Sequence, residues 1–238
     1  MSGRALASHV NPDLARIRLP DGAPGPNLWY RLNRGLLRTW MPLVWRMRVF
    51  NRHVEPAAGG AVYMCNHQSF MDPVLMALAL QRPMHYMARD SLFRHPLFGR
   101  LIESLNAFPV RRGTADTAAL KEALRRVRRG EQVVLFPEGT RTRDGRIGRF
   151  LPGVAFVARR ARATTVPVVI DGAYECWPRT RRLPRPGEII VCYGRPYPPE
   201  AARAMSPEAF VGRVRADMIA IQADIRRRVG RPLLTYDT

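Results

Sequence analysis

The sequence has only three cysteines, Cys65, Cys176 and Cys192, and none of them stands in a C-x-x-C pair. A disulfide framework and a cysteine-based zinc site are therefore poorly supported, and a reducing setting inside the cell is expected. No uncharged apolar run reaches the roughly 18 residues that suggest a membrane-spanning helix, and residues 1–25 lack the continuous apolar stretch of a signal peptide. Any contact with a membrane is therefore expected to be peripheral.

Lysine is also nearly absent, because Lys121 is the only one. Lysine and arginine together nevertheless number 39 against 19 aspartates and glutamates, which gives a formal net charge of +20. Such a surface attracts nucleic acid, an anionic membrane, phosphorylated small molecules or acidic carrier proteins. The arginines fall in several clusters along the chain, so they do not form a disordered basic arm.

The 238 residues suffice for one domain with a substantial core. Residues 1–27 form a lead-in rich in proline and glycine, to which we assign no chemistry. Short apolar runs predict strands at 61–65, 84–88, 107–110, 132–136, 165–170 and 188–193. The clearest predicted helices are 73–80, 115–129 and 207–229, the last with Ser206 as its N-cap. This alternation predicts a single α/β domain with a mixed, largely parallel sheet covered by helices.

Residues 28–50 predict an amphipathic N-terminal helix ahead of that domain. On a helical wheel one face is basic and the opposite face carries Leu32, Leu36, Trp40 and Leu43. Pro42 is expected to kink or divide the helix. A basic face beside an apolar face rich in tryptophan is typical of a helix lying in a membrane interface, and packing against the domain core is an equal alternative.

Polar clusters follow four of the predicted strands, at the strand ends where ligands bind in parallel sheets. The first, "NHQSFMDP", places His67 and Asp72 five residues apart. The two can meet only if His67 lies in the turn before the helix. Ser69-x-x-Asp72 fits a capping box, and Asp72 itself is the alternative cap, so either arrangement supplies such a turn. The carboxylate would then orient the imidazole and make it a better proton acceptor.

The second cluster, "FPEGTR", spans residues 136–141 and joins an acid, a glycine and an arginine. Gly139 permits a tight turn or close approach of a ligand, and Arg141 offers a forked donor for phosphate. The structural alternative is a polar turn in which Glu138 pairs with Arg141.

These two motifs, together with "AFPVRRG" and "VPVVI", resemble the glycerolipid acyltransferase family that includes 1-acylglycerol-3-phosphate acyltransferases. The resemblance covers about residues 60–195 and would make residues 51–238 an acyltransferase domain. It implies transfer of a fatty acyl group from acyl-coenzyme A or acyl-carrier protein to the hydroxyl of a lysophospholipid, with no metal or other cofactor. It also implies attachment to an anionic membrane surface at its cytoplasmic face.

The resemblance implies that His67 is the general base and Asp72 its partner. The implied substrate-binding residues are Arg111, Arg112, Glu138, Gly139, Thr140 and Arg141. Backbone amides at the helix start after His67 are candidate donors to the oxyanion. The sequence departs from the family pattern at Asn106, where glycine is common, and at the doubled arginine, so either Arg111 or Arg112 could face the ligand.

Three alternatives remain open from the sequence. The acceptor could be another lysolipid or a lyso-aminolipid. Cys65, two residues from His67, could serve a hydrolase or thioesterase as its nucleophile. The basic composition also suits a nucleic-acid-binding protein, although no helix-turn-helix, zinc finger or aromatic RNA-binding signature appears.

Overall fold

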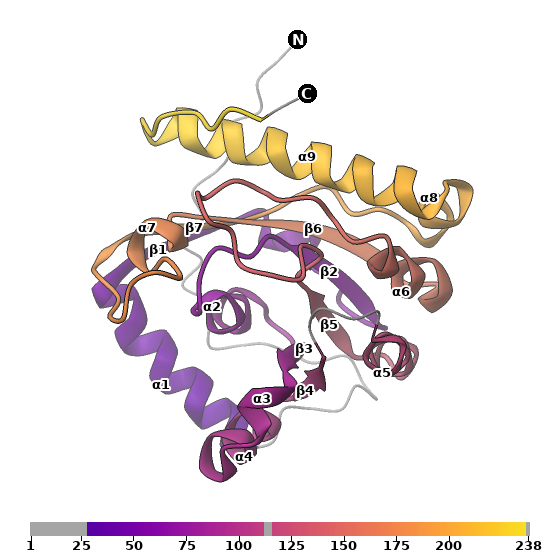
Figure 1. The fold of residues 1–238 in the computed structure, drawn as a ribbon, viewed down its shortest axis with the longest axis horizontal. Helices are drawn as coiled ribbons and strands as arrows, with labels where there is room; N and C mark the ends of the chain where they lie inside the picture. The colour runs from indigo at the N-terminus through magenta and orange to yellow at the C-terminus, as the bar shows by residue number, and fades with distance from the viewer. Residues whose placement is uncertain (1–27, 112–115, 237–238) are drawn as a thin grey trace.

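A computed structural model describes residues 28–111 and 116–236 of the chain (Figure 1). Its centre is a seven-stranded sheet in the order β1-β7-β6-β2-β5-β3-β4. The strands are β1 (Trp45–Phe50), β2 (Ala61–Cys65), β3 (Met84–Arg89), β4 (Ala107–Val110), β5 (Gln132–Leu135), β6 (Thr164–Asp171) and β7 (Gly187–Tyr193). Only the β6–β7 pair is antiparallel among these strands. The predicted α/β class with a mixed, largely parallel sheet is confirmed.

Helices cover both faces of this sheet, and Figure 1 shows α9 on one side and α2 on the other. The longer helices are α1 (Leu28–Val44), α2 (Asp72–Ala79), α4 (Pro96–Ser104), α5 (Thr117–Arg128), α6 (Gly153–Ala161) and α9 (Pro207–Arg228). The short ones are η2 (Arg52–Val54), α3 (Asp90–Phe93), α7 (Ala173–Cys176) and α8 (Pro199–Ala204).

Alternate residues of the central strands pack into two separate cores. Val62 and Met64 of β2 face the core shared with α5, α6 and α9. Tyr63 and Cys65 face the opposite core, which contains residues of α1, α2 and α7. Because both faces are buried, these strands are continuous apolar runs in the sequence, which is why their positions could be predicted.

The predicted helix 28–50 is wrong for its last six residues. The helix ends at Val44, and Trp45–Phe50 form the edge strand β1, which pairs in parallel with β7. The stretch "WRMRVF" largely alternates apolar and basic side chains, which fits a strand as well as a helix, and pairing with β7 decides between them. Pro42 does not divide the helix, because it lies within the last turn.

The orientation of α1 is the reverse of that expected for a surface helix in water. Arg34 donates a hydrogen bond to the carbonyl of Gln81 at 2.6 Å, and Arg38 donates to the carbonyls of Leu78 and Leu80. Burial lowers the pKa of Arg38 to about 10, and the charge of the neighbouring Arg34 acts in the same direction. Arg34 and Arg38 therefore face the domain, beside the buried Tyr30 and Met41. The apolar side chains of Leu32, Leu36, Trp40 and Leu43 are left exposed.

Candidate active site

The polar segments that follow β2, β5 and β6 meet at one edge of the sheet. These strands are mutually parallel, so their carboxyl ends lie together. The amide of His67 donates to Glu138 Oε1 at 2.9 Å, and the amide of Thr142 donates to the carbonyl of His67 at 2.8 Å. The amide of Tyr174 donates to Gln68 Oε1 at 3.1 Å, which ties in the segment after β6. Three distant stretches of the chain thus form one site.

His67 and Asp72 are in direct contact at this edge. His67 Nδ1 lies 2.7 Å from Asp72 Oδ2, and the histidine is 5% exposed while the aspartate is fully buried. Oδ2 also accepts hydrogen bonds from the amides of Gln68 at 2.6 Å and Ser69 at 2.7 Å. Because Oδ2 acts as the acceptor in all three contacts, it holds the proton of His67 on Nδ1. Nε2 is then left as the basic nitrogen.

The turn before α2 places the two side chains, but not through a full capping box. The carboxylate half is present, because Asp72 Oδ2 accepts from the Ser69 amide. The hydroxyl half is missing, since Ser69 Oγ donates to the carbonyl of Trp177 at 2.9 Å and accepts from the amide of Met71. Asp72 is the first residue of α2 and does not cap it.

The amides of residues 67–69 are not available as oxyanion donors. The His67 amide is bonded to Glu138, and the next two amides are bonded to Asp72. An amide bonded to a buried carboxylate would have to leave that partner to bind a substrate oxygen, which is costly. The expectation that the helix start supplies these donors is therefore wrong for these residues.

Glu138 joins the histidine segment to the loop after β5. Its two carboxylate oxygens accept hydrogen bonds from the amides of His67, at 2.9 Å, and Gly148, at 3.0 Å. Burial raises the pKa of Glu138 to about 7, while these two hydrogen bonds act in the opposite direction. Glu138 thus positions the backbone around the histidine.

Gly139 adopts a conformation that other residues rarely take. Its φ is +67°, and a Cβ atom added there would lie 2.8 Å from Cδ1 of Leu151. The left-handed backbone favours glycine, and a larger residue would also make the exposed Leu151 side chain move aside. The following Thr140 is exposed.

Arg141 lies beside the histidine segment, with its guanidinium carbon 3.4 Å from the centre of the Phe70 ring. Phe70 is 53% exposed, and its ring centre lies 5.5 Å from that of Trp177. The His67 ring stacks on Phe136 at 4.3 Å. The site therefore combines a cationic group with an apolar aromatic surface, which suits an amphipathic substrate carrying an anion.

The two arginines after β4 are not placed in this site by the contacts of the described residues. Arg111 is exposed, and its amide donates to Asp116 Oδ2 at 2.8 Å. Arg112 lies outside the described residues. Sequence reasoning missed Asn66, whose side chain bonds both the amide and the carbonyl of Ile170, and it gave no role to Gln68.

Cys65 does not fit the alternative role of nucleophile. Its side chain is fully buried in the core with α2, and its thiol donates to the carbonyl of Asn66 at 3.4 Å. Burial raises the pKa of this thiol well above its ordinary value, and the nearby Asp72 raises it further. A reactive cysteine needs the opposite, a lowered pKa and exposure.

The fold and the site define a class of protein: an α/β domain with a histidine–carboxylate pair that can deprotonate a hydroxyl. The chain belongs to the acyltransferase family, whose model matches residues 46–171, just over half of the chain. The family membership implied by the sequence motifs is thereby confirmed.

Known proteins similar to this chain carry related names. A Cocos nucifera protein named 1-acyl-sn-glycerol-3-phosphate acyltransferase is 32% identical over 139 residues, which cover 57% of this chain and 45% of that protein. A Bacillus subtilis protein of the same name is 28% identical over 169 residues, covering 70% and 81% respectively. The chain thus spans less than half of the coconut protein and most of the bacterial one.

A solved structure shares the fold. The crystal structure of the 1-acyl-sn-glycerophosphate acyltransferase PlsC from Thermotoga maritima matches with a TM-score of 0.69 and 24% identity. The match covers 82% of this chain and 79% of that one.

Proposed function

We propose that the protein transfers a fatty acyl group from an acyl thioester, acyl-coenzyme A or acyl-carrier protein, to the hydroxyl of 1-acyl-sn-glycerol-3-phosphate in phospholipid biosynthesis. The names of the relatives support this acceptor. The observation that carries the proposal is the contact of His67 Nδ1 with Asp72 Oδ2 at 2.7 Å. It leaves Nε2 as a base at the edge of the sheet where substrates bind.

The reaction follows from this geometry. Nε2 of His67 takes the proton of the acceptor hydroxyl as that oxygen attacks the thioester carbonyl, and Asp72 stabilises the imidazolium. The tetrahedral intermediate then breaks its carbon–sulfur bond, and the imidazolium returns the proton to the departing thiolate. The products are an ester and a free thiol, and no acyl-enzyme forms. General-base catalysis of this kind contributes about 10²- to 10⁴-fold.

The acceptor phosphate is assigned to Arg141, with Arg111 or Arg112 as a second donor. The guanidinium of Arg141 lies over the exposed Phe70 ring. In that position it can pair with a phosphate while the aromatic surface contacts the glycerol and acyl parts of the acceptor. Glu138 and Gly139 shape the pocket, and Thr140 borders it. The reaction itself calls for no metal or other cofactor.

The exposed apolar face of α1 is assigned to the membrane. Leu32, Leu36, Trp40 and Leu43 are 60%, 65%, 43% and 82% exposed. Trp29 of α1 donates a hydrogen bond to Ser104 at 2.9 Å, which joins α1 to α4.

Leu97, Phe98 and Leu101 of α4 are likewise exposed, at 74%, 43% and 39%. An exposed apolar surface of this kind marks a docking site. Exposed arginines on the same helices, Arg31 on α1 and Arg100 on α4, complement anionic lipid headgroups.

We therefore propose a peripheral or monotopic attachment at the cytoplasmic face of the membrane. Among the described helices none is long and apolar enough to cross a bilayer.

The test is to offer a labelled acyl thioester to wild type, His67→Ala and His53→Ala with a panel of lysolipids that includes lyso-aminolipids. His53 is exposed and serves as the matched control. His67→Ala should lower turnover of 1-acyl-sn-glycerol-3-phosphate by about 100-fold or more, while His53→Ala should leave it unchanged. Equal turnover by wild type and His67→Ala would show that His67 is not the general base. Faster transfer to another lysolipid would show that this lysolipid is the acceptor.

A further inference from the structure

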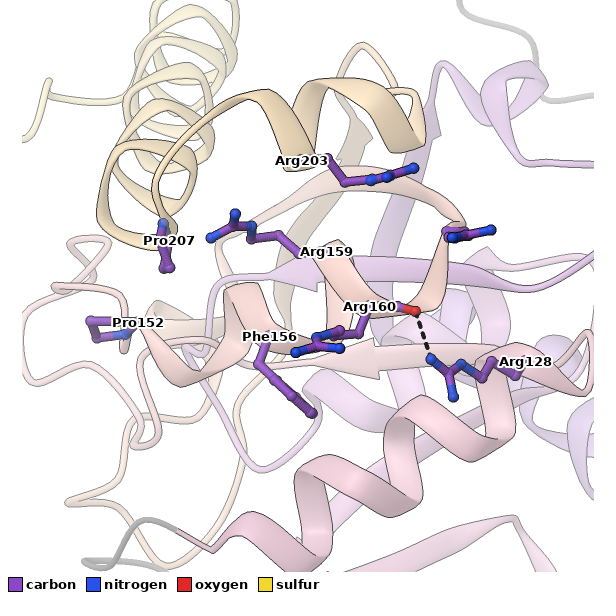
Figure 2. Close-up of a pocket in the computed structure, with 8 residues that line it drawn as sticks. Arg128, Pro152, Phe156, Arg159, Arg160, Arg203 and Pro207 are labelled. Atoms are coloured by element: carbon purple, nitrogen blue, oxygen red, sulfur yellow. Dashed lines mark hydrogen bonds between the residues drawn. The ribbon is translucent and has the colours of Figure 1, made fainter.

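A cavity of about 590 Å³ lies along α6 (Figure 2). α5, α8 and the start of α9 supply the rest of its lining. Its volume is that of a typical small-ligand site. Five arginines line it: Arg128, Arg159, Arg160, Arg162 and Arg203.

Within the described residues these arginines have no acidic partner. None of the five forms an ion pair there, and no described carboxylate lines the cavity. Arg128 instead donates to the carbonyl of Arg160 at 3.1 Å, which holds it toward α6 (Figure 2). Like charges gathered at a concave surface repel one another and concentrate anions. The cavity is therefore built for a ligand with several negative charges.

Arg162 supports this conclusion independently. It ends α6 with a φ of +51°, a left-handed conformation that disfavours side chains with a Cβ. The ends of α5 and α9 are followed by glycines in that region, Gly130 and Gly230. At the end of α6 an arginine takes the strained position, and its side chain adds a charge to the cavity. Strain of this kind is found at functional positions.

One end of the cavity adjoins the candidate active site. Pro152 lines the cavity, and its neighbour Leu151 packs on Gly139 and donates its amide to the carbonyl of Pro137. From Pro152 to Arg162 the helix rises about 15 Å, at 1.5 Å per residue. An extended ligand could thus reach from the arginines to the active-site loop.

We propose that this cavity binds the phosphorylated nucleotide part of an acyl-coenzyme A donor. The guanidinium groups pair with its phosphates, the partly exposed ring of Phe156 stacks on its base, and its thioester arm runs past Pro152 toward His67. The proposal rests on the proposed function, and it chooses between the two donors considered there.

Two observations favour a soluble nucleotide over other anions. The apolar face of α1 lies with the core on the opposite face of the sheet from α6, so a membrane bound there is remote from the cavity. The arginines gather around one depression of about 590 Å³, which is the size of a small-ligand site, whereas a carrier protein would cover a larger area.

The test compares two matched variants. Arg159→Ala/Arg160→Ala removes two neighbouring arginines from the last turn of α6, and Arg227→Ala/Arg228→Ala removes two from the last turn of α9. Coenzyme A binding is measured by calorimetry, and turnover is measured with acyl-coenzyme A and with acyl-pantetheine, which lacks the nucleotide. The α6 variant should bind coenzyme A about 10-fold or more weakly and show an equal rise in KM for acyl-coenzyme A.

Further outcomes complete the test. With acyl-pantetheine the α6 variant should match wild type, and the α9 variant should match wild type with both donors. Equal binding of coenzyme A by all three proteins, or an equal loss in both variants, overturns the proposal. The proposal is also overturned if wild type does not bind coenzyme A and the α6 variant loses turnover with acyl-carrier protein. A protein that binds coenzyme A through these arginines but transfers no acyl group would overturn only the proposed function.

Discussion

The replacement Asp72→Asn tests the central contact of the site at nearly constant size. The carboxylate oxygen Oδ2 accepts three hydrogen bonds, whereas Oδ1 is buried and has no partner within the described structure. An amide can keep the three bonds only with its oxygen at the Oδ2 position. Its NH₂ group then lies unsatisfied at the Oδ1 position, which should lower the free energy of unfolding by about 1–3 kcal/mol.

The replacement should lower kcat as well as the free energy of unfolding. The neutral amide no longer stabilises the imidazolium, and a hydrogen bond to a charged group contributes about 1.5–3 kcal/mol. Since 1.36 kcal/mol corresponds to a factor of ten in rate, kcat should fall by about 10- to 150-fold. Release of free thiol from the acyl thioester, followed with a thiol reagent, measures kcat directly.

Two comparisons make this prediction decisive. Asp171→Asn changes another buried aspartate, which accepts hydrogen bonds from Arg226 and Arg231, so it should destabilise the fold but leave kcat of the folded protein unchanged. The double variant His67→Ala/Asp72→Asn should be no slower than His67→Ala, because the two residues act as a unit. The reasoning is refuted if Asp72→Asn stays within about threefold of wild type, or if the two losses multiply.

Three other predictions concern Glu138, Arg141 and the exposed face of α1. Burial raises the pKa of Glu138 from 4.5 to about 7, so the folded protein retains a proton that the unfolded chain releases between these values. The stability of wild type relative to Glu138→Gln should therefore fall by about 3 kcal/mol as pH rises through that window, and urea titrations showing a constant difference contradict this. Arg141→Ala should raise KM for the phosphorylated acceptor about 10-fold, with an unaltered KM counting against the phosphate contact. Leu36→Ser/Leu43→Ser should weaken binding to anionic vesicles, measured by flotation, without lowering Tm, because both side chains are exposed. Undiminished binding would show that this face of α1 does not contact the membrane.

Periodicity accounts for most of what could be predicted about the fold. Strands buried on both faces form short apolar runs, and the runs 61–65 and 107–110 match β2 and β4 residue for residue. The edge strand β1 escaped prediction because its alternating basic residues also fit a helical wheel. Its conformation depends on pairing with β7, more than 130 residues away in the chain.

The chemistry of the site was partly visible in the chain as well. His67 and Asp72 are five residues apart, and a turn followed by a helix start is a local arrangement that their neighbours predict. The contacts that support this pair leave no such pattern in the sequence, because they join residues far apart in the chain. Asn66 bonds the backbone of Ile170, and Glu138 bonds the amide of His67, across more than 100 and about 70 residues respectively.

The sequence by itself determined the α/β class, the family motifs and the neighbouring pair of base and carboxylate, because each depends on side-chain chemistry and spacing within a short stretch. Tertiary structure alone decided which face of α1 is exposed, which backbone amides remain available and how arginines from α5, α6 and α8 come to line one cavity. Those outcomes depend on how the sheet brings distant segments together, and no local pattern encodes that arrangement.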